Sequence, residues 1–125
     1  MFFVVSWSFA QDIPNARTAY DPARNTISEA FRGEIIEKEF STSNIYSGTH
    51  RKYWIYIPRK YRPDKPACLY VSLDGISFDA PTVFDNLIET GDMPVTIGVF
   101  VTAGILSDSD GKPVRFNRSN EFDRT

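Results

Sequence analysis

ACLYVSL (residues 67–73) and VTIGVFV (residues 95–101) are the two segments that decide the fold. Both are nearly continuous apolar runs, which are typical of strands buried on both faces of a parallel sheet. Between them, PTVFDNLIE (residues 81–89) places its apolar residues on one stripe at helical spacing. A strand, a helix and a strand within about 35 residues predict a βαβ unit with parallel strands.

Three residues mark the ends of the predicted helix. Asp79 is a candidate N-cap, Pro81 suits the first turn, and Gly91 is a candidate C-terminal stop. Only this one clear helix is predicted, although a parallel sheet needs helices on both faces. We therefore expect at least one buried-type strand to be left at an edge of the sheet, and we expect the isolated chain to self-associate.

Upstream of this unit, two further strands are predicted. Residues 34–40 alternate imperfectly, and residues 53–57 are rich in aromatic and β-branched side chains and stop at Pro58. The polar stretch 41–49 between them favours an antiparallel hairpin. Beyond Ala103 the chain turns polar and predicts a loop. The fold class is α/β, with antiparallel first strands followed by a βαβ unit of a mostly parallel sheet.

Composition excludes several classes of function. The net charge of −2 and the sequence pI near 5.3 give no basic surface for nucleic acid. No apolar run approaches the roughly 18 residues of a membrane span. Cys68 is the only cysteine and His50 the only histidine, so Cys/His metal sites are poorly supplied. The acidic stretch 108–111 fails the ligand spacing of a calcium loop. We predict no metal and no cofactor.

The N-terminus predicts export. Residues 2–9 are almost wholly apolar, and Ser8-Phe9-Ala10 is a small-x-small sequence suited to signal peptidase. We interpret residues 1–10 as a clipped signal peptide and residues 11–32 as a polar leader, with the folded domain at residues 33–125. The expected location is periplasmic or secreted. The alternative is a plain apolar N-terminal strand.

The chemistry begins directly after the first buried-type run. Gly75, within Leu73-Asp74-Gly75-Ile76, lets the chain turn sharply. A backbone N–H just past this turn lies at the carboxyl edge of the sheet, where open α/β folds bind ligands. From the residues alone, an ordinary strand-to-helix turn is the competing interpretation.

The wider sequence resembles a known family. GTHRKYWIYIP (residues 48–58) is similar to the opening motif of the enterochelin-esterase-like and feruloyl-esterase-like α/β-hydrolases. The likeness covers residues 33–123 and continues through residues 65–71, 73–75, 83–88, 93–101 and 117–123.

The resemblance implies the N-terminal portion of an α/β-hydrolase fold. It also implies an oxyanion donor at the N–H of Ile76, and a loop with Arg118 near the mouth of the active site. The family's serine nucleophile lies in a G-x-S-x-G elbow further along, followed by the acid and the histidine; these have no match here. The expected function is therefore that of the N-terminal fragment of an exported serine esterase acting on a small-molecule or carbohydrate ester.

Two other functions stay open from the residues. A compact hydrolase would use His50, Asp74 and Ser77, although that chain order is wrong for this fold. A small carbohydrate-binding module would use exposed aromatic residues of strand 53–57. Arg118 is a candidate substrate-binding residue, and the alternative for it is a structural ion pair with Glu121 on one helical turn.

Overall fold

The computed structural model describes residues 29–123. The predicted signal peptide, residues 1–10, and residues 11–28 of the predicted leader lie outside the described residues. The described chain begins with a 3₁₀ turn, η2 (Glu29–Phe31). The elements that follow are β1 (Glu34–Phe40), β2 (Thr49–Ile57), β3 (Cys68–Leu73), α1 (Ala80–Thr90), β4 (Thr96–Val101), β5 (Ile105–Ser107), β6 (Pro113–Phe116) and α2 (Arg118–Glu121).

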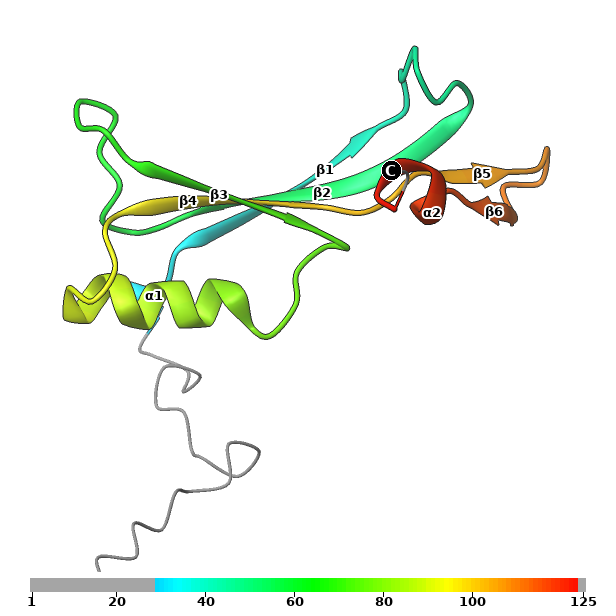
Figure 1. Cartoon of the computed structure of the whole chain (residues 1–125). Coiled ribbons are helices and arrows are strands. Elements are labelled where there is room, and N and C mark those ends of the chain that lie inside the picture. Colours follow the sequence, from blue (N-terminus) through cyan, green and yellow to red (C-terminus); the bar gives the residue numbers. More distant parts are fainter. Residues whose placement is uncertain (1–28, 124–125) are drawn as a thin grey trace, which may run out of the picture.

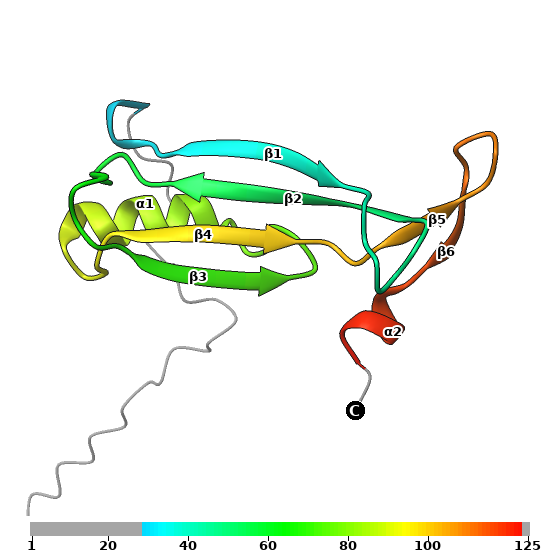
Figure 2. The ribbon, with the colours of Figure 1, turned by 90° about the horizontal axis from the view of Figure 1, so that it is seen from above.

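The strands form one mixed sheet. Its order is β3-β4-β2-β5-β6, with β1 paired to β2. β1 and β2 are antiparallel, as predicted. β3 and β4 are parallel and are joined through α1, so the predicted βαβ unit is confirmed. Helix α1 lies against one face of the sheet (Figures 1 and 2), and β5, β6 and α2 extend from the far end of β2.

The core lies between α1 and the sheet. Its buried apolar side chains are those of Tyr56, Phe84, Ile88 and Phe100. The ring of Phe84 meets that of Tyr56 edge-on at a centroid distance of 5.8 Å. Along β4, buried residues alternate with half-buried ones. One face of this strand is therefore covered by α1, and the other face is open.

Strand β3 differs from its prediction. Leu69 is 67% exposed and Val71 57% exposed, and Cys68 is exposed too, whereas the apolar run predicted burial on both faces. The reason is position: β3 is the last strand of the sheet, and α1 covers only one face. The expectation that a buried-type strand would be left at an edge is confirmed.

Asp85 ties the beginning of β1 to helix α1. Its Oδ1 accepts hydrogen bonds from the Tyr56 hydroxyl at 2.6 Å and from the Gly33 N–H at 2.9 Å. Burial, together with this hydrogen bond, raises the pKa of Tyr56. A Cβ on Gly33 would lie 2.5 Å from Cε2 of Tyr56 and 2.7 Å from the carbonyl oxygen of Ile57. Only glycine fits this close approach of the chain to Tyr56 and Ile57.

Two further predictions need correction. The chain beyond Ala103 is not a loop: β5 continues the sheet by pairing Ile105 with His50, and β6 pairs with β5. Asp79 stands at the N-cap position, but its φ of 53° is left-handed and its side chain makes no capping bond. Pro81 in the first turn and Gly91 at the C-cap, with φ 85°, are as predicted.

Candidate functional site

The loop between β3 and α1 is strained. Asp74, Phe78 and Asp79 have φ values of 68°, 56° and 53°, and they are the only non-glycine residues with positive φ in the described part of the chain. Such left-handed conformations cost free energy and cluster at functional sites. The strain is thus concentrated in residues 74–79, at the carboxyl end of β3.

Gly75 fixes where this loop turns. Its φ is 81°, and its N–H donates to the carbonyl oxygen of Val101 at 3.1 Å. A Cβ here would meet Trp54 at 3.3 Å and Thr102 at 3.4 Å, so both conformation and space favour glycine. The next N–H, that of Ile76, donates no hydrogen bond within residues 29–123. The loop thus presents a backbone donor without a partner there.

Arg118 holds this loop from the C-terminal side. Its Nε and Nη2 each donate to one carboxylate oxygen of Asp74 at 2.7 Å, and its Nη1 donates to Asp123 at 2.9 and 3.1 Å. The predicted pair of Arg118 with Glu121 is therefore wrong. The hydrogen bonds between the two side chains lower the pKa of Asp74 and, together with the charge of Asp123, raise the pKa of the Arg118 guanidinium.

A cleft of about 390 Å³ opens beside the loop. Among residues 29–123, Nη2 of Arg118 makes one hydrogen bond, to Asp74, and its second N–H has no partner there. Phe116 exposes 72% of its surface at the cleft. An apolar wall next to the guanidinium of Arg118 suits a ligand with an apolar body and an oxygen at one end. The lining residues are Asp74, Thr102, Ala103, Ile105, Phe116 and Arg118.

Glu121 organises the C-terminal segment, and sequence reasoning missed this role. Its carboxylate accepts from Nη1 and Nη2 of Arg51 at 2.7 and 3.0 Å. It also accepts from the Gly104 N–H at 3.0 Å and from Nδ2 of Asn117 at 2.9 Å. The spacing of Asn117 and Glu121, four apart on a helical turn, was the available signal. The network joins β2, the β4–β5 connection and α2.

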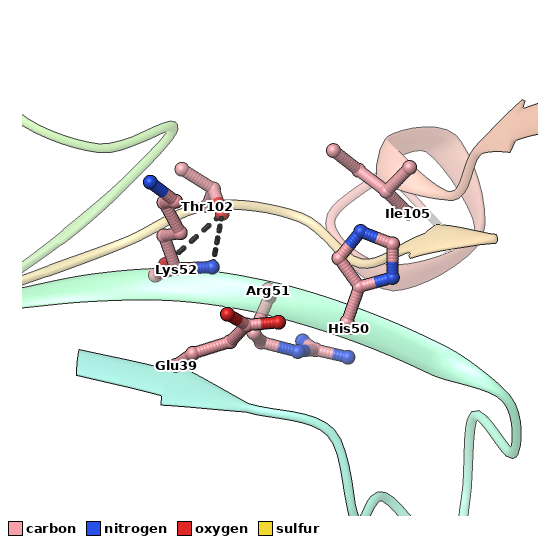
Figure 3. A pocket seen from close by; sticks show the side chains of 6 residues that line it. All are labelled: Glu39, His50, Arg51, Lys52, Thr102 and Ile105. Atoms are coloured by element: carbon pink, nitrogen blue, oxygen red, sulfur yellow. Dashed lines mark hydrogen bonds between the residues drawn. The ribbon is translucent and has the colours of Figure 1, made fainter. Parts of the chain in front are cut away.

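His50 lies in a different cleft. This cleft has a volume of about 340 Å³. Figure 3 shows the six residues that line it, which are Glu39, His50, Arg51, Lys52, Thr102 and Ile105. The Thr102 hydroxyl donates to the carbonyl oxygen of Lys52 at 3.0 Å and accepts from the N–H of Lys52 at 3.2 Å. In residues 29–123 the imidazole of His50 has no hydrogen bond to Asp74 or Ser77, and Asp74 is held by Arg118. The parts of the compact triad are not brought together.

None of the aromatic residues of β2 is fully exposed, and Tyr53 and Trp54 are half-buried. Tyr56 is fully buried in the core, and Nε1 of Trp54 donates to Glu37 at 3.0 Å.

No group of metal-ligating side chains occurs among the described residues. In that same part of the chain, neither helix has the length and apolarity needed to cross a membrane.

Comparisons with known proteins place the fold. No family model and no curated protein matches the chain. Two solved structures match it with a TM-score of 0.52 and 19% sequence identity, each covering 67% of this chain and 31% of its own length. One is a protein named FAE. The other is a serine-to-alanine mutant of the feruloyl esterase module from Clostridium thermocellum, in complex with sinapinate. The chain thus has an esterase-like fold and spans about a third of these structures.

Proposed function

We propose that this chain is the N-terminal part of a serine esterase that hydrolyses carboxylic esters, and that it supplies one half of the oxyanion hole. The strained loop 74–79, which leaves the N–H of Ile76 without a partner among residues 29–123, is the observation that carries the proposal. Such a donor stabilises the negative oxygen that forms when a serine attacks the ester carbonyl. Gly75, with its φ of 81°, allows the sharp turn directly before this donor.

Arg118 and the cleft supply the substrate side of the proposal. The pair with Asp74 keeps the loop in place, and the second N–H on Nη2, which has no partner in the described part of the chain, would contact an ester oxygen. Phe116 and Ile105 provide an apolar wall for the acid part of the ester. Because a solved structure of similar fold holds sinapinate, an aromatic carboxylate, we choose sinapinate as the probe.

Sinapinate binding tests the proposal on the chain itself. In a titration of ¹⁵N-labelled protein, the amide resonances of Gly75 and Ile76 should shift together with that of Phe116 and saturate. The Phe116→Ala variant should weaken binding about tenfold, since it removes the aromatic wall worth about 1.5 kcal/mol. Val114→Ala, on the same strand and equally exposed, is the matched control. Shifts elsewhere, or none up to millimolar sinapinate, contradict the proposal.

Export is part of the same proposal. The apolar stretch 2–9 followed by Ser8-Phe9-Ala10 is its basis, and the location is periplasmic or secreted. When the protein is produced with its natural upstream sequence, the mature chain should begin at Gln11. N-terminal sequencing of the exported protein checks this, and an intact Met1 contradicts it.

A further inference from the structure

The indole of Trp54 lies against the turn at Gly75. Trp54 is two residues before Tyr56 on β2, so both side chains are on the face of the sheet that α1 covers. The loop from β3 to α1 reaches the same face. A Cβ on Gly75 would lie 3.3 Å from Cζ3 and 4.0 Å from Cη2 of the Trp54 ring. The six-membered ring of the indole therefore fills the space beside this glycine, one residue before the N–H of Ile76.

Glu37 on β1 fixes the orientation of this indole. Glu37 and Trp54 are directly opposite each other in the pairing of β1 with β2, so their side chains share a face. Nε1 of Trp54 donates to one carboxylate oxygen of Glu37 at 3.0 Å, and Nζ of Lys52 donates to the other at 2.7 Å. These hydrogen bonds lower the pKa of Glu37, which is therefore ionised at neutral pH. The indole is held by β1 at its nitrogen while its other ring contacts the turn.

Thr102 supports the same glycine from a second side. Its Cγ2 would lie 3.4 Å from a Cβ on Gly75. Its hydroxyl is bonded to both backbone groups of Lys52, at 3.0 and 3.2 Å (Figure 3). Lys52 consequently reaches both supports of the turn, Trp54 through the carboxylate of Glu37 and Thr102 through its own backbone.

We propose that Trp54 is a positioning residue for the oxyanion donor, and that Glu37 orients Trp54 for this task. The inference rests on the proposed function for the role of the Ile76 N–H. Strained backbone conformations such as those of residues 74–79 persist only where the surrounding structure holds them. Arg118 holds the loop through Asp74 from the C-terminal side, and the indole holds it from the sheet.

The exposure of Glu37 allows positioning to be separated from stability. The side chains of Glu37 and Lys52 are 51% and 57% exposed, and ion pairs at such exposed positions contribute little to the free energy of unfolding. Replacing Glu37 should therefore leave the protein folded while it releases the indole. A donor on a less ordered loop binds an oxygen less tightly, because the loop must then be ordered on binding.

Substitutions on β1 test the orientation of the indole. In Glu37→Ala, the nuclear Overhauser effect between the Trp54 ring and the α-protons of Gly75 should be lost. The Gly75 amide, which donates to Val101, should also exchange faster. Glu37→Gln keeps an acceptor for the indole N–H and should restore both signals. Glu39→Ala is the matched control: this glutamate is also exposed, lies on the same face of β1, and should be replaceable without effect on either signal. Urea unfolding verifies that every variant is folded.

The affinity for sinapinate measures the consequence for the donor. Glu37→Ala should raise the dissociation constant about two- to tenfold, the range that one hydrogen bond contributes, and Glu37→Gln should recover the wild-type value. Signals at Gly75 that Glu37→Ala leaves unchanged overturn the inference, whether or not sinapinate binds. So does a wild-type affinity in Glu37→Ala. If the wild type binds no sinapinate, the proposed function fails, and the Gly75 signals of the two Glu37 variants alone decide whether Trp54 positions the loop.

Discussion

Replacing Glu121 with alanine should lower the free energy of unfolding by about 3–5 kcal/mol, because it leaves a buried cation without its partner. The Glu121 side chain is 1% exposed and that of Arg51 is 13% exposed. Their two hydrogen bonds, at 2.7 and 3.0 Å, are the charge-assisted links between β2 and α2. Without the carboxylate, the guanidinium, the Gly104 N–H and the Asn117 amide all lose an acceptor.

Urea unfolding followed by circular dichroism measures this loss. Glu89→Ala is the matched control, since its ion pair with Lys60 is partly exposed and should contribute no more than about 1 kcal/mol. Equal losses for the two variants would contradict the buried network.

The same carboxylate gives the wild-type protein a pH dependence. Burial raises the pKa of Glu121, but the hydrogen bonds from Asn117 and Gly104 and the charge of Arg51 outweigh it, and the pKa is lowered overall. A carboxyl with a lowered folded-state pKa stabilises the fold above its unfolded pKa of about 4.3, and this contribution is lost as pH falls through the folded value. Below about pH 4 the wild type should therefore lose stability more steeply than Glu121→Gln.

Local patterns were enough to predict the first part of the fold. The runs at residues 34–40, 53–57 and 67–73 and the helical stripe at residues 81–89 each lie within a single observed element, to within one residue. Their signal is carried by neighbouring residues, through periodicity, β-branched and aromatic content, and glycine or proline at the ends. β2 begins four residues earlier than predicted. Arg51 and Lys52 pair with the end of β1, and Thr49 and His50 pair with β5; the second contact is one that no local pattern contains.

The second part of the fold depends on distant contacts. β5 has three residues and β6 has four exposed residues, so both are too short for a period to be recognised in the sequence. They form because β5 adds to β2, and because the buried Asn117 and Glu121 anchor the C-terminal segment next to β6. The exposure of β3 could not be predicted from local patterns either. Its composition predicts a buried strand, whereas its place at the edge is set by the order of the sheet.

For the candidate site, the position of the loop after β3 could be predicted from the sequence, but the ion pair between Arg118 and Asp74 that holds it could not. The Asp-Gly turn lies where it was expected, after β3 and before α1. The partner of Asp74 is 44 residues away, and helical spacing pointed instead to a local pair of Arg118 with Glu121. An ion pair between separate elements has no spacing rule, so only the folded chain identifies it.

The purified chain should hydrolyse no ester above the buffer rate. Turnover by a serine requires a base in hydrogen-bond reach to remove its proton, and disabling a working triad costs about 10⁶ in kcat. Across residues 29–123, Ser77 has no hydrogen bond to His50, whose imidazole lies near Ile105 in a separate cleft. Asp74 is committed to Arg118.

Release of p-nitrophenol from a short-chain ester, measured for the wild type and for Ser77→Ala and His50→Ala, decides between the two interpretations of this chain. If the chain contributes only a scaffold, a cleft and one oxyanion donor, all three proteins give the buffer rate, because a donor without a nucleophile stabilises a charge that never forms. Turnover in the wild type that both substitutions abolish would mean that His50 and Ser77 meet in solution. The compact triad would then replace our proposal, and Asp74 would have to leave Arg118 to orient the imidazole.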